Sequence, residues 1–139
     1  MYTYTRRVQY YETDRMGVTH NSNYIRWMEE ARCAFLDYIG WNYRKFEDVG
    51  ITSPVAFVSC EYKSPTTFDD EFEVRIEVER LTSTRLFAVY EIWNKTTGKL
   101  AAEGRTTTCM LAPDGRIIRI DREYPDYYNA LAAHKRAEK

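Results

Sequence analysis

One long amphipathic helix among several strand-like segments is the feature of this sequence that most limits its possible folds. Over residues 23–39 the apolar side chains recur at intervals of three and four, which predicts a helix roughly 25 Å long. Over residues 71–79 apolar and charged residues alternate strictly, which predicts a strand with one buried and one solvated face. A fold for this chain must therefore place several strands against a single helix.

Other segments rich in Val, Ile, Thr and aromatic residues also predict strands, because turn residues separate them. We predict strands over residues 2–12, 51–62, 84–93 and 100–111, a short edge strand over 116–120, one helical turn within 41–49 and a terminal helix over 125–139. Strands and helices do not alternate, which argues against a doubly wound parallel sheet. The prediction is an α+β fold in which an antiparallel β-sheet of five or six strands wraps around the central helix, as a single domain over residues 1–139.

The predicted helix has defined ends and two distinct faces. Asn21 or Ser22 is a suitable N-cap, and Gly40 stands where a C′ glycine belongs. One face carries Tyr24, Trp27, Met28, Ala31, Phe35 and Tyr38, and the other carries Arg26, Glu29, Glu30, Arg32 and Asp37. A single helix covers only one face of a sheet, yet segment 84–93 is apolar on both. We therefore expect a second subunit to cover the other face, which makes the protein a homo-oligomer.

Composition argues against several classes of partner. The formal net charge of −1 provides no electrostatic footprint for DNA or RNA. No apolar run approaches the roughly 18 residues of a membrane span, and the first residues lack a signal-peptide core. Three widely spaced cysteines without a CxxC pair indicate free thiols and a cytoplasmic protein. Because His20 and His134 are the only histidines, we do not expect a histidine-based zinc site.

The residues with catalytic potential lie just before the helix. Asp14 follows the first predicted strand, Gly17 interrupts the pattern, and the helix begins some seven to nine residues after the aspartate. A helix start exposes four unpaired N–H groups and about half a positive charge, which favours an ionised carboxylate nearby. From its position alone, Asp14 also fits a turn residue that hydrogen-bonds its own backbone. Facing the helix start, it would act as a base or nucleophile on a carbonyl that the N–H groups polarise.

A site with so few groups suits a thioester better than an ester or an amide. The leaving thiolate has a conjugate acid with a pKa of about 8.5, so it departs without a strong general acid. Oxygen esters and amides release much stronger bases and normally need a proton donor. Oxyanion-stabilising donors contribute about 3–4 kcal/mol, and a general base about 10²–10⁴-fold in rate. The residues therefore predict thioester hydrolysis without histidine, cysteine or metal.

The sequence around Asp14 resembles a known family. Asp14-Arg15-Met16-Gly17-Val18, followed by Asn21, Tyr24, Trp27 and Glu30-Ala31-Arg32, is similar to the signature of hotdog-fold acyl-CoA thioesterases of the 4-hydroxybenzoyl-CoA thioesterase type. Lys63-Ser64-Pro65 with Asp69-Asp70 fits the family's turn between its second and third strands, so the resemblance covers most of the chain. It implies a hotdog fold and hydrolysis of an acyl-CoA to the free acid and CoA. It implies no cofactor, because coenzyme A is part of the substrate.

The resemblance also implies roles for individual residues. Asp14 is the catalytic carboxylate, as nucleophile or general base, and the backbone N–H of Asn21 polarises the thioester carbonyl. Gly17 lets the loop approach the substrate, and Tyr24 anchors the helix start. Relatives of this type are commonly tetramers built from pairs of subunits, which implies a homodimer or homotetramer here.

Other residues near the motif are open to two interpretations. His20 stands where relatives often have a bulky aromatic residue, and it either contacts the acyl group, positions water, or is a loop histidine bonded to backbone. Arg80 and Arg85 flank the turn after the third strand and either bind the CoA phosphates or are exposed strand-end arginines. Glu12 and Glu30 are interpreted as a loop carboxylate and part of a solvated helix face rather than as catalysts.

Two further functions stay open on the same fold. A hydratase or dehydratase would need an Asp–His pair, for which His20 is the one nearby candidate, without a hydratase-like motif around it. A non-catalytic module that binds acyl-CoA or acyl-carrier protein is an alternative from another class, because fold does not fix function. No spacing in the sequence encodes the acyl group, or whether CoA or an acyl-carrier protein carries it.

Overall fold

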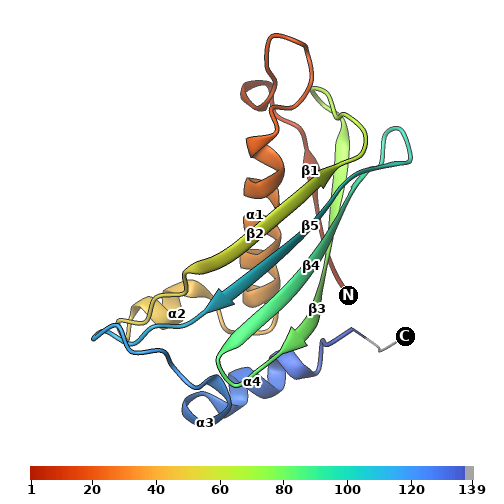
Figure 1. The fold of residues 1–139 in the computed structure, drawn as a ribbon. Coiled ribbons are helices and arrows are strands. Elements are labelled where there is room, and N and C mark those ends of the chain that lie inside the picture. The colour runs from red at the N-terminus through yellow and green to blue at the C-terminus, as the bar shows by residue number, and fades with distance from the viewer. Residues whose placement is uncertain (137–139) are drawn as a thin grey trace.

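The computed structural model describes residues 1–136 and shows a five-stranded antiparallel sheet curled around one long helix, α1 (Figure 1). The strands are β1 (Tyr2–Arg7), β2 (Val55–Tyr62), β3 (Glu71–Leu81), β4 (Arg85–Asn94) and β5 (Lys99–Cys109). The helices are η1 (Tyr10–Glu12), α1 (Ser22–Tyr38), α2 (Tyr43–Glu47), α3 (Ile120–Glu123) and α4 (Pro125–Ala132). The strand order is β1-β3-β4-β5-β2, so β1 and β2 form the edges. The predicted α+β class is confirmed, with five strands.

Helix α1 begins and ends within one residue of its predicted limits. At its C-terminal end Gly40 has a φ of +85°, a conformation that an L side chain rarely adopts. The Gly40 amide donates to the Asp37 carbonyl at 3.1 Å, and the Trp41 amide donates to the Leu36 carbonyl at 2.9 Å. These two bonds form a Schellman motif, and the prediction of a C′ glycine is confirmed.

The prediction for the two faces of α1 was wrong at two positions. Tyr38 is exposed, although it was assigned to the apolar face. Arg32 was assigned to the polar face but is only 5% exposed. Its Nε donates to the Tyr43 hydroxyl at 3.1 Å, and its Nη1 donates to the Tyr90 hydroxyl at 3.2 Å. Two hydroxyls from α2 and β4 therefore satisfy a guanidinium that helix periodicity alone would place in water.

The sheet packs on α1 through alternate residues of each central strand. In β3 the buried apolar residues are Phe72, Val74, Ile76 and Val78, and in β4 they are Leu86, Ala88, Tyr90 and Ile92. On β5, a Cβ at Gly104 would collide with the sulfur of Met28 and would lie 3.1 Å from the Ser59 carbonyl oxygen. Glycine at this position therefore lets α1 approach β5 closely. The alternation predicted for residues 71–79 is confirmed.

The first predicted strand is shorter than expected. It ends at Arg7 instead of residue 12, because the Val8 amide pairs with the Asp70 carbonyl at 2.9 Å and the chain then turns into η1. The side chain of Glu12 accepts from the Gln9 amide at 2.9 Å and closes this turn. The prediction from Tyr, Thr and Val residues therefore overestimated the length of the strand. It did not take into account a turn that the Glu12 side chain closes.

Differences at other segment ends have similar causes. The predicted strand over 51–62 begins only at Val55. Residues 116–120 form no strand beyond an isolated bridge between Ile117 and Leu111, and the chain continues into α3 at Ile120. Helix α4 ends at Ala132, and residues 137–139 of the predicted terminal helix lie outside the described residues. A single bridge is too short to extend the sheet.

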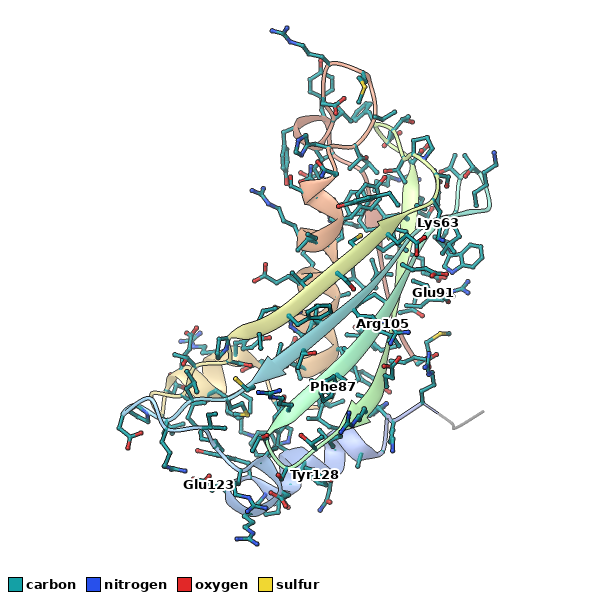
Figure 2. All side chains as sticks on the ribbon, viewed as in Figure 1. Lys63, Phe87, Glu91, Arg105, Glu123 and Tyr128 are labelled. Carbon is teal, nitrogen blue, oxygen red and sulfur yellow. The ribbon has the colours of Figure 1, made fainter. Side chains whose placement is uncertain are left out.

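The face of the sheet opposite α1 is partly apolar. Phe87, Glu91 and Arg105 lie on this face, in front of the sheet in Figure 2, whereas α1 passes behind it. Phe87 and Trp93, together with Val89, are half-buried within one chain. The segment 84–93 is therefore apolar on both faces, as the sequence indicates. Cover for the second face by another subunit stays a prediction.

Two further predictions concern membrane-spanning segments and free cysteine thiols. Across residues 1–136, the structure has no helix with both the length and the apolar character needed to cross a bilayer. Cys33, Cys60 and Cys109 are free thiols in this structure.

Candidate active site

The segment between η1 and α1 folds as a tight hairpin that carries Asp14. Thr13 and Thr19 form an isolated antiparallel bridge, and the Asp14 amide donates to the Val18 carbonyl at 2.9 Å. The Gly17 amide donates to the Asp14 carbonyl at 3.0 Å, and Gly17 has a φ of +77°. A Cβ at Gly17 would meet no atom within 4 Å. Within one chain, glycine is therefore needed for the backbone conformation of the turn, not to admit a crowded neighbour.

The carboxylate of Asp14 is held on one side only. Its Oδ1 accepts from the Met16 amide at 2.8 Å, which is the turn role considered from the sequence. Its Oδ2 has no hydrogen bond or ion pair with any residue in 1–136, and the side chain is half-buried. The turn therefore fixes the carboxylate while leaving one oxygen available for a proton or a carbonyl carbon.

The start of α1 leaves one backbone donor unused. The His20 carbonyl accepts from the Asn23 amide at 3.0 Å. The Asn21 N–H shares a trans peptide with that carbonyl and so points the opposite way, away from the helix body. In the part of the chain that the structure describes, this N–H has no acceptor. The arrangement leaves a backbone donor at the positive end of a helix, ready for a ligand oxygen.

His20, rather than Asn21 or Ser22, provides the side-chain cap. The Asn21 side chain makes no capping bond. The Nδ1 atom of His20 accepts from the Ser22 amide at 3.3 Å and lies 2.9 Å from the Ser22 hydroxyl. No contact joins this ring to Asp14 among residues 1–136, so the Asp–His pair of a hydratase is not formed within one chain.

Tyr24 and the hairpin meet at one buried threonine. The Tyr24 hydroxyl lies 3.1 Å from the Thr66 hydroxyl, which lies 2.6 Å from the Thr19 hydroxyl. The Thr19 amide also donates to the Thr66 carbonyl at 2.8 Å. The Tyr24 ring meets the Trp27 ring edge-on with centroids 5.0 Å apart, and burial raises the pKa of Tyr24. These contacts join the first turn of α1 to the base of the hairpin.

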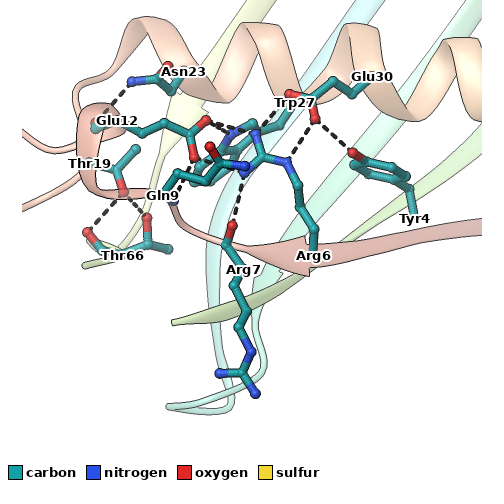
Figure 3. Close-up of polar contacts among 10 residues, drawn as sticks. All are labelled: Tyr4, Arg6, Arg7, Gln9, Glu12, Thr19, Asn23, Trp27, Glu30 and Thr66. Carbon is teal, nitrogen blue, oxygen red and sulfur yellow. Dashed lines mark hydrogen bonds and ion pairs between the residues drawn. The ribbon is translucent and has the colours of Figure 1, made fainter. Parts of the chain in front are cut away.

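The carboxylate of Glu12 is the centre of a buried network beneath the hairpin (Figure 3). Arg6 donates through Nη1 to Oε1 at 2.8 Å and through Nη2 to Oε2 at 2.7 Å. Trp27 Nε1 donates to Oε2 at 2.7 Å, and the Gln9 amide donates to Oε1. Arg6 Nε also donates to Glu30 Oε1 at 2.8 Å. The network therefore joins β1, η1 and α1.

The backbone carbonyl of Glu12 binds the helix start directly. It accepts from the His20 amide at 2.8 Å and from the Asn23 side-chain amide at 3.0 Å. Glu12 lies at the start of the hairpin, two residues before Asp14, and its carbonyl binds His20 at the end of the hairpin. One residue therefore fixes both ends of the hairpin. The interpretations of Glu12 as an ordinary loop carboxylate and of Glu30 as solvated were wrong: Glu12 is 2% exposed and Glu30 is half-buried.

Electrostatics keeps Glu12 ionised. Burial raises its pKa, but hydrogen bonds from Arg6, the Gln9 amide and Trp27 outweigh burial and hold the pKa below its ordinary value. The hydrogen bond from Arg6 to Glu12 likewise raises the pKa of that guanidinium. The pair is therefore charged at neutral pH.

A hollow of about 320 Å³ opens at the helix start. Its lining residues are Thr19, Asn21, Tyr24, Tyr62, Lys63, Ser64 and Pro65. Asp14 is not part of this lining, but it pairs with Val18, which is three residues before Asn21 and so within roughly 10 Å of it along the chain. The structure thus brings Asn21 and Tyr24 together at the hollow, with Asp14 and Gly17 beside it on the hairpin.

The two predicted phosphate-binding arginines lie elsewhere. Glu71 begins β3 near the hairpin, and Arg80 is nine residues further along that strand, roughly 30 Å away. The Arg80 guanidinium lies 5.1 Å from the centroid of the Phe87 ring, and Arg85 is exposed at the start of β4. Within one chain the structure does not bring Arg80 or Arg85 to Asp14.

Two residues of this site were missed from the sequence. Tyr62 and Thr66 each act through a partner far along the chain: Tyr62 through Asn21 and Thr66 through Tyr24. Helical or strand periodicity reports neighbours within one element only. No local spacing could have identified these two.

Comparisons with known proteins identify the family of this chain. A family model described as the thioesterase-like superfamily matches residues 8–130. A protein of Aquifex aeolicus (strain VF5), provisionally named an esterase, is 38% identical over 88% of this chain and 93% of its own length. A 1,4-dihydroxy-2-naphthoyl-CoA hydrolase of Thermosynechococcus vestitus is 25% identical over 88% of this chain and 84% of its own.

Solved structures give the same result for the fold. The crystal structure of a DHNA-CoA thioesterase from Staphylococcus aureus superposes with a TM-score of 0.88 at 33% identity. The match covers 94% of this chain and 88% of that chain.

Proposed function

Because the chain belongs to the thioesterase-like superfamily, it is a thioester hydrolase with the hotdog fold, and we propose that it cleaves acyl-CoA thioesters at Asp14 and Asn21. The observation that supports this assignment is the presence of two unused polar groups on the hairpin and at the helix start that follows it. One oxygen of Asp14 and the N–H of Asn21 are both without a partner among the described residues, and the hairpin holds them on adjacent segments. A thioester carbonyl placed between them would meet an anionic base on one side and a donor on the other.

In the general-base route, Asp14 takes a proton from water as the water oxygen attacks the carbonyl carbon. The resulting oxyanion accepts a hydrogen bond from the Asn21 N–H, and collapse of the tetrahedral intermediate expels the CoA thiolate. In the nucleophilic route, an Asp14 oxygen attacks instead, the thiolate leaves, and water hydrolyses the mixed anhydride. Both routes release a free acid and CoA and need no cofactor beyond the substrate's own CoA.

The remaining residues would contribute to binding. Gly17 and His20 border the reacting groups on the hairpin, and Tyr24 lines the hollow at the helix start. We propose CoA rather than an acyl-carrier protein as the carrier, because relatives are named as CoA-ester hydrolases. Arg80 and Arg85 would reach a CoA phosphate only from a second copy of the chain, since they lie at the far end of the sheet.

We also propose that the enzyme is a homo-oligomer, with β2 as the first contact. This edge strand leaves Val55, Phe57 and Val58 exposed, with Phe57 at 54%. An apolar edge with unpaired backbone groups is a template for a second strand, and a second copy supplies an identical one. The half-buried Phe87 and Trp93 on the outer face would then give a second contact that turns a dimer into a tetramer.

Asp14→Asn tests the catalytic assignment. We expect kcat for acyl-CoA hydrolysis to fall by at least about 10²-fold, while binding of the intact thioester survives because the amide is nearly isosteric. Thiol release and calorimetric binding measure the two effects. Asp126→Asn, an exposed carboxylate on α4, is the matched control and should leave turnover unchanged. Full turnover in Asp14→Asn would contradict the assignment.

A single turnover in ¹⁸O-labelled water separates the two routes. With enzyme in excess, the nucleophilic route places label in Asp14 when water attacks the anhydride at the side-chain carbon, and in the free acid when water attacks the acyl carbon. The general-base route places label only in the free acid. Label in the peptide that contains Asp14, measured by mass spectrometry, therefore identifies the nucleophilic route.

A further inference from the structure

Tyr62, the last residue of the edge strand β2, makes a direct bond to the start of α1. Its hydroxyl donates to the Asn21 carbonyl at 3.1 Å, across 41 residues of sequence. Its ring meets the ring of Tyr24 edge-on, with centroids 5.3 Å apart. Both tyrosines line the hollow at the helix start together with Asn21. Tyr62 therefore touches the residue whose N–H is the donor in the proposed reaction.

The position of Tyr62 is itself well fixed. Its backbone pairs in register with Ala102 on β5. The next two amides, of Lys63 and Ser64, both donate to the Ala101 carbonyl, at 2.8 and 3.2 Å. The Ser64 hydroxyl donates to the Leu100 carbonyl at 2.7 Å. The phenol is thus carried by backbone that is bonded to the sheet immediately before and after it.

The Asn21 backbone has few other constraints. Besides the bond from Tyr62, its carbonyl receives a long bond of 3.3 Å from the Tyr24 amide, and its side chain makes no capping bond. First turns of helices fray when their groups lack partners. The bond from Tyr62 holds the peptide that follows Asn21, and the bond from Asn23 to the His20 carbonyl holds the peptide that precedes it. Together they set the direction of the Asn21 N–H.

We infer that Tyr62 is a positioning residue that acts through Asn21, by keeping the oxyanion donor aimed at the thioester carbonyl. This inference rests on the proposed function. Tyr62 reacts with no substrate atom, and its effect belongs to the transition state, where the N–H bond to the developing oxyanion is strongest. Burial raises the pKa of Tyr62, so the phenol stays a donor throughout the neutral range.

Tyr62→Phe removes the donor and keeps the ring. We expect kcat to fall by about 5- to 30-fold, the effect of losing one positioning hydrogen bond, with KM nearly unchanged. The melting temperature should move little, because Tyr62 is 46% exposed. Tyr11→Phe is the matched control: Tyr11 is 72% exposed and its hydroxyl has no hydrogen bond among residues 1–136. It should leave both constants unchanged.

The Asn21 amide gives a readout independent of turnover. In ¹⁵N–¹H spectra of the unliganded protein, Tyr62→Phe should shift the resonances of Asn21 and Ser22 and speed their hydrogen exchange, whereas Tyr11→Phe should not. Unchanged kcat would overturn the inference. So would a rise in KM alone, which would make Tyr62 a substrate contact, or a fall in kcat without any change at the Asn21 amide.

Asp14→Asn separates this inference from the proposed function. If Asp14→Asn abolishes hydrolysis and Tyr62→Phe has no effect, only the role of Tyr62 fails. If Asp14→Asn retains full activity, the catalytic assignment fails, and with it the reason for positioning Asn21.

Discussion

Glu12 is two residues before the proposed catalytic carboxylate, Asp14, and its own carboxylate has a structural role. Each of its carboxylate oxygens accepts two hydrogen bonds, and its carbonyl accepts two more from the start of α1. Arg6 balances its charge. A buried ion pair with this many bonds is costly to break, since removing one partner leaves the other charged and unsatisfied. Glu12 therefore holds the base of the hairpin and the start of α1 together.

The lowered pKa of Glu12 predicts an acid-sensitive fold. A carboxylate whose pKa is lower in the folded state stabilises that state above its unfolded pKa of about 4.3. That contribution is lost as the pH falls through the folded pKa. We expect Glu12→Gln to lower the free energy of unfolding by about 2 kcal/mol at pH 7, and the gap to wild type to narrow below about pH 4.3.

Urea unfolding at several pH values between 7 and 3 measures this gap. Glu123→Gln is a suitable comparison, because Glu123 is ion-paired with Arg116 at the surface, where such a pair contributes little. A gap for Glu12→Gln that stays constant down to pH 3 would show that its charge is irrelevant.

At single residues, sequence reasoning works best where the relevant partner is close along the chain. Asp14 and Asn21 are seven residues apart, so the loop and the helix start could be considered together, and their catalytic role stays a prediction. Arg32 failed for the opposite reason: its partners Tyr43 and Tyr90 come from two other elements. Their hydroxyls turn a residue that looks solvated on a helical wheel into a buried one.

Among the elements, the hairpin before α1 depends on one conformation. Gly17 has a φ of +77° in open space, so an alanine there meets no steric neighbour and only strains the backbone. Gly98, in the turn between β4 and β5, has a φ of +75° in equally open space. The two glycines form a matched pair that differs in distance from Asp14.

We expect Gly17→Ala and Gly98→Ala to lower the free energy of unfolding by similar amounts, about 1–2 kcal/mol each. Only Gly17→Ala should also lower kcat, because relief of its strain moves the Met16 amide that holds the Asp14 carboxylate. Urea unfolding and thioester turnover on both variants test this. Equal turnover in the two would mean that the turn does not orient Asp14.

Strand β3 and helix α1 were predictable because burial imposes a period on each of them. The charged and apolar alternation in β3 and the stripe on α1 needed no knowledge of neighbours. The errors fall where periodicity is short: residues 8–12 turn around the Glu12 side chain, and residues 116–120 make only a bridge at Ile117. In these two segments, residues with a high strand propensity lie in turns or make their contacts outside the sheet.

At the scale of the whole molecule, the edge strand β2 exposes apolar side chains, and this predicts the assembly. Phe57→Lys places a charge in the exposed apolar edge of β2, which opposes strand pairing between copies. We expect wild type to sediment as a dimer or tetramer and Phe57→Lys to shift toward the monomer. Val49→Lys places the same charge at an exposed valine outside β2, and it should not alter the mass of the assembly. A monomeric wild type, or a Phe57→Lys variant of unchanged mass, would contradict β2 as the contact.

The same eight-residue strand ends in Tyr62, whose phenol bonds to the start of α1. The edge strand β2 is therefore bonded directly to Asn21, whose N–H is the donor in the proposed reaction. A peptide that displaces the second copy from β2 and shifts Tyr62 would slow hydrolysis without entering the substrate's path. Such inhibition would be noncompetitive, and excess thioester would not reverse it.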